Sequence, residues 1–220
     1  MAFTFTLVYA AASIFLSAQD AADDIRAEEI RKLRTCLELV QEDPEAAYEM
    51  SLSWLYEGNR PGARECKATA LIALEDFEEG ALQLEALANA PDGGELEDRA
   101  HYLSRAGNAW LQAGLPEEAI IAFDNALTLY KENFDLYKYR AQAYLALGDW
   151  DKAEADLDLA LGSQPGDINA WLYRAQARLG QRRYDDAMDD VVQARAIDPE
   201  NIDALLLRGQ IREEKRLAEE

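Results

Sequence analysis

The sequence predicts an all-α protein built as a solenoid of antiparallel helix pairs. Over its C-terminal half the sequence matches itself at a 34-residue offset, and a fixed period of this order is the signature of a repeat architecture. Within each period, apolar residues recur at spacings of three and four, as an amphipathic helix requires. Glycine and proline recur at fixed points of the period, where they end the helices.

Residues 1–19 are mostly apolar and contain no Asp, Glu, Lys or Arg. An apolar N-terminal run that ends in small residues, here Ser17 and Ala18, is typical of a secretory signal peptide. We therefore predict that residues 1–19 are a signal peptide, cleaved near Ala18 or Gln19. The run is also nearly long enough to stay as a membrane anchor over residues 3–19, and an ordinary buried first helix is the third alternative.

Residues 20–60 are predicted to form an N-terminal helical cap of two helices, at about 21–41 and 45–57. Asp43-Pro44 separates them, because proline cannot continue a helix. The letters GNRP end the second helix.

The chain has two cysteines, and both fall on predicted helices. In an exported chain a lone pair commonly forms one disulfide, whereas in the cytosol both would be small buried residues. Cys36 and Cys66 are therefore a candidate disulfide that would join the first helix to the helix that opens the repeats.

Residues 61–99 are predicted to contain a degenerate repeat unit, at about 61–94, and a loop. The unit keeps its large apolar residues in register, but Gly80 and Leu87 replace the alanines of the later units. The letters PDGGELED then interrupt the spacing.

Three complete units follow without insertion, at 100–133, 134–167 and 168–201. Small residues occupy one column of their first helices and two columns of their second helices, and close packing of two helices requires small side chains where they cross. These columns are Gly107, Ala141 and Ala175, then Ala119, Ala153 and Ala187, then Ala126, Ala160 and Ala194. Residues 202–220 start a further unit but end as REEKRLAEE. Because solenoids need polar ends, we predict that this segment is a C-terminal capping helix.

These columns resemble the tetratricopeptide repeat, whose 34-residue unit has Gly or Ala at place 8, Ala at 20 and 27, and a large apolar residue at 24. The resemblance covers residues 100–201 and, less completely, 61–94. With the apolar run at residues 1–19, the whole chain resembles exported bacterial proteins of this family. Place 7, often Leu in the family, is Arg140, Arg174 and Arg208 here. The resemblance implies a right-handed α-solenoid whose first helices line a concave groove that binds a partner peptide.

In the family, places 2, 5, 9, 12 and 13 of each first helix generally face the groove, and place 6 borders it. Carried onto this sequence, the expected groove residues are Ser104, Arg105, Asn108, Gln112, Lys138, Tyr139, Gln142, Leu172, Tyr173 and Gln176. The amides of Asn108, Gln142 and Gln176 share one column and could bond a peptide backbone without reading its sequence. The match to the family's carboxylate clamp is partial, since Tyr139 stands where Asn is usual. We therefore expect a moderately polar peptide.

The formal net charge of −21 argues against nucleic acid and against an anionic membrane surface as partners. His101 is the only histidine, and no nucleophile elbow, phosphate loop or dinucleotide fingerprint occurs. We expect no enzyme activity, no catalytic residue, no metal site, no cofactor and no small-molecule substrate.

Arginines and aspartates also recur at the 34-residue offset. Arg140 with Asp156, and Arg174 with Asp190, are predicted to form salt bridges between successive helices; we expect exposed pairs that each stabilise by roughly 0–1 kcal/mol. Arg174, Arg178 and Arg182 form a basic stripe that either docks an acidic tail or is neutralised by Asp185 to Asp190.

The sequence therefore predicts a protein–protein interaction scaffold or adaptor that binds a partner peptide or protein in its concave groove. The expected location is the bacterial periplasm, with anchoring in the inner membrane by residues 3–19, or a cytoplasmic location, as the alternatives. The alternative function is an accessory subunit of an assembly that uses its convex face or its caps and leaves the groove unused.

Overall fold

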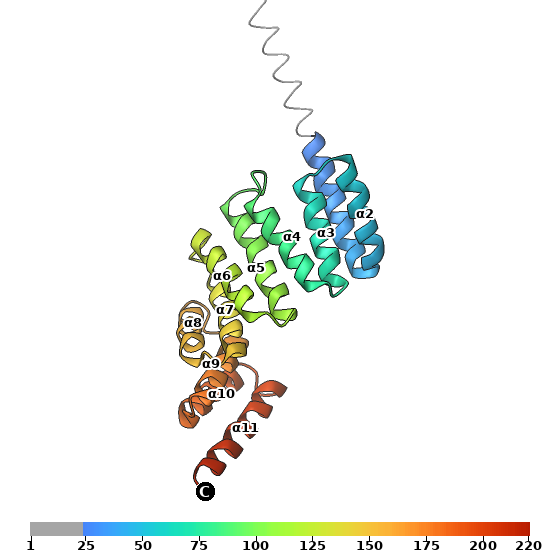
Figure 1. The fold of residues 1–220 in the computed structure, drawn as a ribbon. Coiled ribbons are helices and arrows are strands. Elements are labelled where there is room, and N and C mark those ends of the chain that lie inside the picture. Colours follow the sequence, from blue (N-terminus) through green and yellow to red (C-terminus); the bar gives the residue numbers. More distant parts are fainter. Residues whose placement is uncertain (1–23) are drawn as a thin grey trace, which may run out of the picture. The chain divides into compact units, whose positions relative to one another are not determined.

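In a computed structural model of the chain, residues 24–220 are described, and they fold into α-helices joined by turns, with no strand among them (Figure 1). The predicted signal peptide or anchor lies outside the described residues. The chain divides into two compact units, one ending at Asp76 and one spanning Phe77–Glu220. Within residues 24–220 no helix is both long and apolar enough to cross a bilayer.

The N-terminal unit contains a helix over residues 24–42, followed by α2 (Pro44–Glu57) and α3 (Pro61–Ala73). Asp43 starts α2, since its Oδ1 accepts a hydrogen bond from the Ala46 amide at 3.0 Å and so satisfies an otherwise free helical donor. The three helices close around Trp54, which is 3% exposed.

Cys36 and Cys66 form a disulfide between the helix of residues 24–42 and α3. Their Cα atoms are 5.9 Å apart, and both side chains are fully buried. The bridge therefore lies in the core of the N-terminal unit.

The C-terminal unit contains eight helices among the described residues. They are α4 (Phe77–Asn89), α5 (Leu96–Gln112), α6 (Pro116–Leu129), α7 (Phe134–Leu147), α8 (Trp150–Ser163), α9 (Ile168–Gly180), α10 (Tyr184–Ile197) and α11 (Ile202–Ala218). The pairs α5/α6, α7/α8 and α9/α10 pack closely and correspond to the three predicted units. The predicted all-α solenoid is confirmed.

The predicted degenerate repeat at 61–94 is divided between the two compact units. Its first helix, α3, packs on α2 and is held there by the disulfide of Cys66, whereas its second helix, α4, packs on α5. Leu84 and Leu87 of α4 are fully buried. Sequence register alone did not reveal this division, because it depends on which neighbour each helix contacts.

The turn inside each unit requires a residue in the left-handed region. Gly114, Gly148 and Arg182 follow one another at the 34-residue offset, and all three have positive φ, at 77°, 75° and 62°. Glycine adopts this conformation without the steric cost that a Cβ imposes. After Gly148 the Asp149 amide donates to the Tyr144 carbonyl at 2.9 Å, which closes the end of α7.

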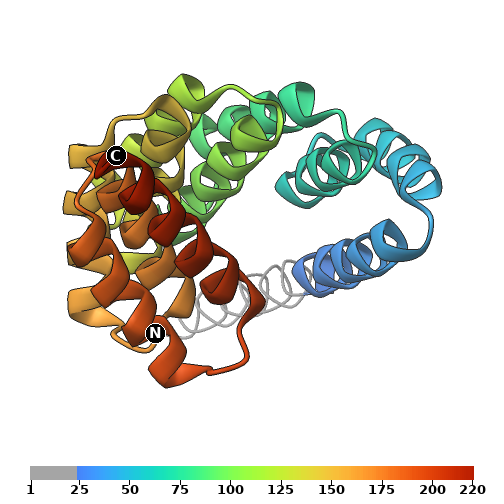
Figure 2. The same ribbon diagram turned by 90° about the horizontal axis from the view of Figure 1, so that it is seen from below.

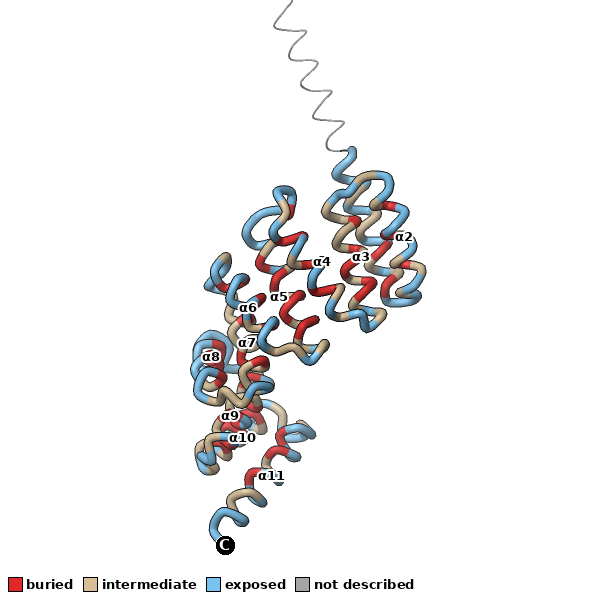
Figure 3. The backbone as a smooth tube through the Cα atoms, viewed as in Figure 1, coloured by how far each residue is buried: buried red, intermediate tan, exposed pale blue. Residues whose placement is uncertain are grey.

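The small-residue columns are buried, and Figure 3 shows that the buried stretches of the helices face neighbouring helices. Ala119, Ala153 and Ala187 are all fully buried. A Cβ added to Gly107 would lie 2.6 Å from ring atoms of Phe123 on α6. The glycine therefore sets the distance between α5 and α6.

Two glycines of one column are expected to respond oppositely to alanine. Gly107→Ala should destabilise by about 1–3 kcal/mol, because the methyl group overlaps the Phe123 ring. Gly209→Ala should stabilise by up to about 1 kcal/mol, because an added Cβ meets no atom within 4 Å and alanine is the better helix former. Urea unfolding followed by far-UV circular dichroism measures both. Equal effects of the two changes would contradict this account.

The predicted arginine–aspartate pairs are present. Arg140 donates from Nε and Nη2 to both oxygens of Asp156 at 2.8 and 2.7 Å, and Arg174 holds Asp190 in the same way at 3.2 and 2.8 Å. The expectation that these pairs are exposed is wrong: Asp156 is 5% exposed and Asp190 is 1% exposed. Each aspartate faces inward between the two helices of its unit, where the arginine satisfies it.

The basic stripe is largely neutralised within the chain. Arg178 Nη1 lies 2.9 Å from Asp190 Oδ2, and its Nε lies 2.8 Å from Glu154 Oε1. Among the aspartates expected to neutralise the stripe, Asp190 therefore pairs with both Arg174 and Arg178. Arg182 lies exposed in the turn between α9 and α10.

Candidate functional site

The first helices of successive units form one row. Contacts join α5 to α7, α7 to α9 and α9 to α11, and Figure 1 shows α11 as the last member of this row. Residues at the same place in each unit therefore follow one another along a common surface.

A hollow of about 300 Å³ lies between α9 and α11. Its lining residues are Asn169, Leu172, Tyr173, Gln176, Asp203, Leu206, Leu207 and Gln210. A second hollow of about 400 Å³ continues from it and shares Gln176 and Gln210. Trp150, Leu179 and Glu214 are among its other lining residues. We call the two hollows together the α9–α11 groove.

Three of the ten expected groove residues line this groove. Leu172 is 5% exposed and forms part of its floor, whereas Gln176 is exposed where the two hollows meet. Burial raises the pKa of the half-buried Tyr173 above its ordinary value of 10.0. The groove thus combines an apolar floor with polar sides, which is the usual composition of a binding cleft.

The column of side-chain amides extends along the row and ends in this groove. Asn108, Gln142 and Gln176 share one place in their units, and their side-chain amides have no hydrogen-bond partner among the described residues. Gln210 continues the column and donates to Glu214 Oε1 at 2.9 Å. Each amide offers two donors and a carbonyl acceptor, so the column can bond the backbone of an extended chain.

Lys138 is already paired within the protein. Its Nζ lies 2.6 Å from Asp167 Oδ2 and 3.1 Å from Asp135 Oδ1, and its side chain is 14% exposed. Burial lowers its pKa, but the hydrogen bonds with the two carboxylates outweigh this and raise the pKa above 10.5. Lys138 therefore joins α7 to the residue that starts α9 and is not a free cation for a carboxylate ligand.

The pairing with Lys138 predicts a pH dependence at Asp167. Burial raises the pKa of Asp167, but the Lys138 hydrogen bond and the Ala170 amide outweigh it and hold the pKa below 3.8. A lowered folded-state pKa means that the stabilisation is complete above 3.8 and is lost as pH falls through the folded pKa.

In Lys138→Met, burial then dominates, so the Asp167 pKa should rise and acid unfolding should begin at higher pH. Carboxyl-carbon NMR titration of Asp167 measures the shift, with the exposed Lys152→Met as the matched control. An unchanged Asp167 pKa in Lys138→Met would contradict the pairing.

The remaining expected residues lie on α5 and α7, away from the α9–α11 groove. Ser104 and Arg105 are half-buried on α5, and Gln112 is exposed, with its Nε2 donating to the Asn108 carbonyl at 3.3 Å. The Tyr139 ring on α7 stacks against Phe123, with ring centroids 6.2 Å apart. These residues follow the same row but do not line either hollow.

The α11 side of the groove is not among the predicted groove residues, because the charged end of residues 202–220 indicates a cap. Asp203, Leu206, Leu207 and Gln210 line it. The 34-residue offset places Gln210 directly after Gln176 in the amide column. The signal was therefore present in the repeat register.

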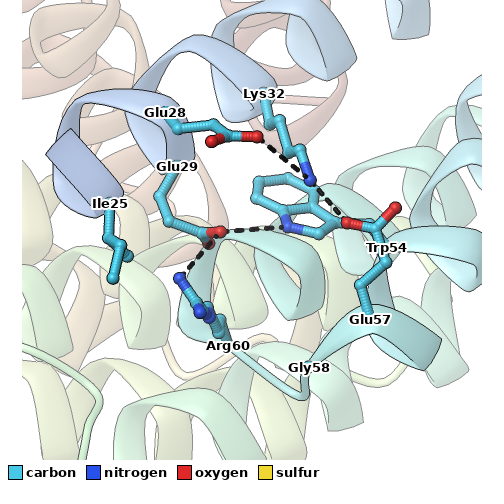
Figure 4. Close-up of a pocket in the computed structure, with 8 residues that line it drawn as sticks. All are labelled: Ile25, Glu28, Glu29, Lys32, Trp54, Glu57, Gly58 and Arg60. Carbon is cyan, nitrogen blue, oxygen red and sulfur yellow. Dashed lines mark hydrogen bonds and ion pairs between the residues drawn. The ribbon is translucent and has the colours of Figure 1, made fainter.

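A separate hollow of about 190 Å³ lies in the N-terminal unit and is lined by charged residues (Figure 4). Lys32 Nζ lies 2.5 Å from Glu57 Oε2 and 3.7 Å from Glu28 Oε1. Glu29 Oε1 accepts from Arg60 Nη1 at 3.2 Å and from the Trp54 indole at 3.3 Å. Because these charges pair with one another, the cluster holds the helix of residues 24–42 on α2.

Across residues 24–220, no group of three or more His, Cys, Asp or Glu side chains is placed to hold a metal ion.

Residues 67–134 and 111–179 each match a model of the tetratricopeptide repeat, and together the matches span just over half of the chain. The chain is a tetratricopeptide repeat protein. The matches include the predicted units 100–133 and 134–167 in full, and they begin inside α3. No curated protein matches this tetratricopeptide repeat protein.

Solved structures agree with this family. The Arabidopsis OM64 TPR domain is 26% identical, with a TM-score of 0.52, over 54% of this chain and 98% of that domain. The first TPR of Spaghetti (RPAP3), bound to the HSP90 peptide SRMEEVD, is 26% identical with a TM-score of 0.51, over 53% and 93%. MamA 41-end from Desulfovibrio magneticus RS-1 is 18% identical with a TM-score of 0.63, over 73% and 89%, and shares the fold.

Proposed function

We propose that this tetratricopeptide repeat protein is an interaction scaffold that holds an extended segment of a partner protein along the amide column and in the α9–α11 groove. The observation that carries the proposal is the continuity of that column into a groove with an apolar floor. The amides of Gln142 and Gln176 can bond a peptide backbone, and the floor at Leu172 can accept an apolar side chain.

The similar TPR domain of Spaghetti (RPAP3) is bound to a peptide that ends in acidic residues, but the groove here favours a different segment. Lys138 is neutralised by two aspartates, and Asp203 adds a carboxylate to the groove wall. The carboxylate of Asp203 would repel the carboxylates of an acidic tail, and this repulsion opposes binding. The partner segment is therefore a moderately polar one that carries no acidic cluster.

We also propose that the protein acts after export, in the bacterial periplasm. Two observations support this location: the uncharged apolar run of residues 1–19 and the buried Cys36–Cys66 disulfide. Disulfides persist in oxidising compartments and are rare in the cytosol.

The groove is tested by Gln142→Ala/Gln176→Ala in a C-terminally tagged chain. Partner recovery on co-purification should fall about tenfold, as expected when central contacts of an interface are removed. Asn125→Ala/Gln193→Ala is the matched control, because it removes two exposed amides from the second helices α6 and α10. Equal recovery with both double variants would exclude the groove as the binding surface.

Location is tested by the N-terminal residue of the purified protein. A chain that begins near Gln19 or Asp20 and is recovered from the periplasm is the expected result. An intact Met1 in a soluble cytosolic chain would overturn the export proposal, and an intact Met1 in the inner membrane would indicate anchoring.

A further inference from the structure

Within residues 77–220, no helix covers the outer side of α11, whereas a second helix covers the corresponding side of the first helix in each of the three units. α6 covers α5, α8 covers α7, and α10 covers α9. α11 repeats the register of these first helices, yet no helix of residues 77–220 lies beyond it, as Figures 1 and 2 show at the C-terminal end of the unit. We call Ile202, Leu205, Arg208, Gly209 and Arg212 the open face of α11.

The other two faces of α11 already have a role. Ala204, Leu207 and Ile211 are buried in the core with α9 and α10. Leu206 and Gln210 line the α9–α11 groove. The open face is thus distinct from the groove and from the core.

Apolar side chains on the open face are more exposed than the residues at the same places in the first helices of the three units. Leu205 is 37% exposed, whereas Leu103 at the same place is 5% exposed. Ile202 is 71% exposed. Gly209 has no atom within 4 Å of an added Cβ, whereas Gly107 is overlaid by Phe123 at 2.6 Å. The crossing point for a second helix is therefore present and unoccupied.

Two arginines on the open face repeat a carboxylate-binding pair. In the preceding unit, Arg174 and Arg178 together hold the buried Asp190. Their equivalents at the 34-residue offset are Arg208 and Arg212, whose i, i+4 spacing places them on one side of the helix. Neither forms an ion pair with another described residue.

We propose that the open face of α11 docks an amphipathic helix of a partner protein that carries a carboxylate beside a bulky apolar residue. The internal copies specify this chemistry. Two of the three covering helices, α8 and α10, lie over a first helix with an arginine at this place, and both present an alanine, then an aspartate three residues later, then an apolar residue. These residues are Ala153, Asp156 and Leu157 of α8, and Ala187, Asp190 and Val191 of α10. All six side chains are at most 5% exposed.

A second copy of this chain does not fit the open face. Two α11 helices related by a two-fold axis would bring the same patch together. Arg208 and Arg212 of one copy would then lie near the same arginines of the other copy, and the positive charges would repel each other. The helices of this chain that carry the matching aspartates, α8 and α10, bury them within their own units. The two arginines of the open face therefore favour an amphipathic helix of another protein that supplies the carboxylate.

The test uses the full chain and a fluorescent peptide that copies residues 183–198, cross-linked through positions 185 and 189 to keep it helical. Both positions are exposed in α10. Fluorescence anisotropy should show saturable binding. The same peptide with Asp190→Asn should bind about tenfold more weakly, because the charge-assisted bonds to the arginines are lost. Arg208→Gln/Arg212→Gln in the protein should weaken the aspartate peptide to the same extent and should not affect the asparagine peptide.

Two protein variants separate this surface from the groove. Gly209→Leu should abolish peptide binding without lowering stability, because it fills the empty crossing point. Gln142→Ala/Gln176→Ala should leave peptide binding unchanged. The proposal would be overturned if the peptide showed no saturable binding or if the aspartate and asparagine peptides bound equally well. It would also be overturned if only Gln142→Ala/Gln176→Ala lost binding. Self-association of the chain that Gly209→Leu abolishes would overturn it in favour of a second copy.

Discussion

Asp190→Ala should lower the free energy of unfolding by about 3–5 kcal/mol, because it leaves two partly buried guanidinium groups without their shared carboxylate. Asp190 accepts from Arg174 at 2.8 Å and from Arg178 at 2.9 Å, and the two arginine side chains are only 13% and 16% exposed. Removal of the carboxylate therefore leaves two positive charges close together between α9 and α10. Urea unfolding measures the loss, and hydrogen exchange should locate it in α9–α11.

Asp158→Ala is the matched control for this prediction. Asp158 binds the same Arg174 at 2.6 Å, but its side chain is 54% exposed. Exposed pairs of this kind contribute about 0–1 kcal/mol. Equal losses in the two variants would show that burial does not decide the strength of these pairs.

Reduction of the Cys36–Cys66 bridge should lower the stability of the N-terminal unit by about 3.5 kcal/mol. The two cysteines have a sequence separation of 30, and closure of a loop of this size restricts the unfolded chain by roughly that amount. Hydrogen exchange should show lost protection in residues 24–76 and unchanged protection in Phe77–Glu220, because the two compact units have separate cores.

Cys36→Ala/Cys66→Ala is the control for reduction, since its hydrogen exchange should not respond to dithiothreitol. Two alkylated thiols in the denatured, unreduced protein from the periplasm would contradict the bridge. Two alkylated thiols in protein made in the cytosol would not contradict the bridge, because that compartment keeps thiols reduced.

The positions of the helices could be predicted because their causes are local in sequence. Gly148 ends α7 through its left-handed backbone, and Pro116 begins α6. The 34-residue offset then placed the small crossing residues, such as Gly107 and Ala119, in columns that the structure buries. Periodicity carries this information because every unit packs on its neighbours in the same way.

The state of the charged residues could not be predicted in the same way. Lys138 has the register of a groove residue, but Asp167, at the end of the same unit, neutralises it at 2.6 Å. Asp156 and Asp190 lie on helices rich in exposed aspartates, yet these two are buried. A one-dimensional pattern gives the place of a charge along a helix but not the distance to a charge on another helix, and that distance sets its pairing.

The sequence by itself determined the helical repeat, its 34-residue period, the family and the register of the amide column, because each follows from spacing along the chain. Only the tertiary structure decided that α3 and α4 belong to different compact units, that the groove lies between α9 and α11, and that no other helix of residues 77–220 covers the open face of α11. These features depend on which helices touch, and contacts between helices are set by the packing of whole surfaces rather than by the period of any one of them.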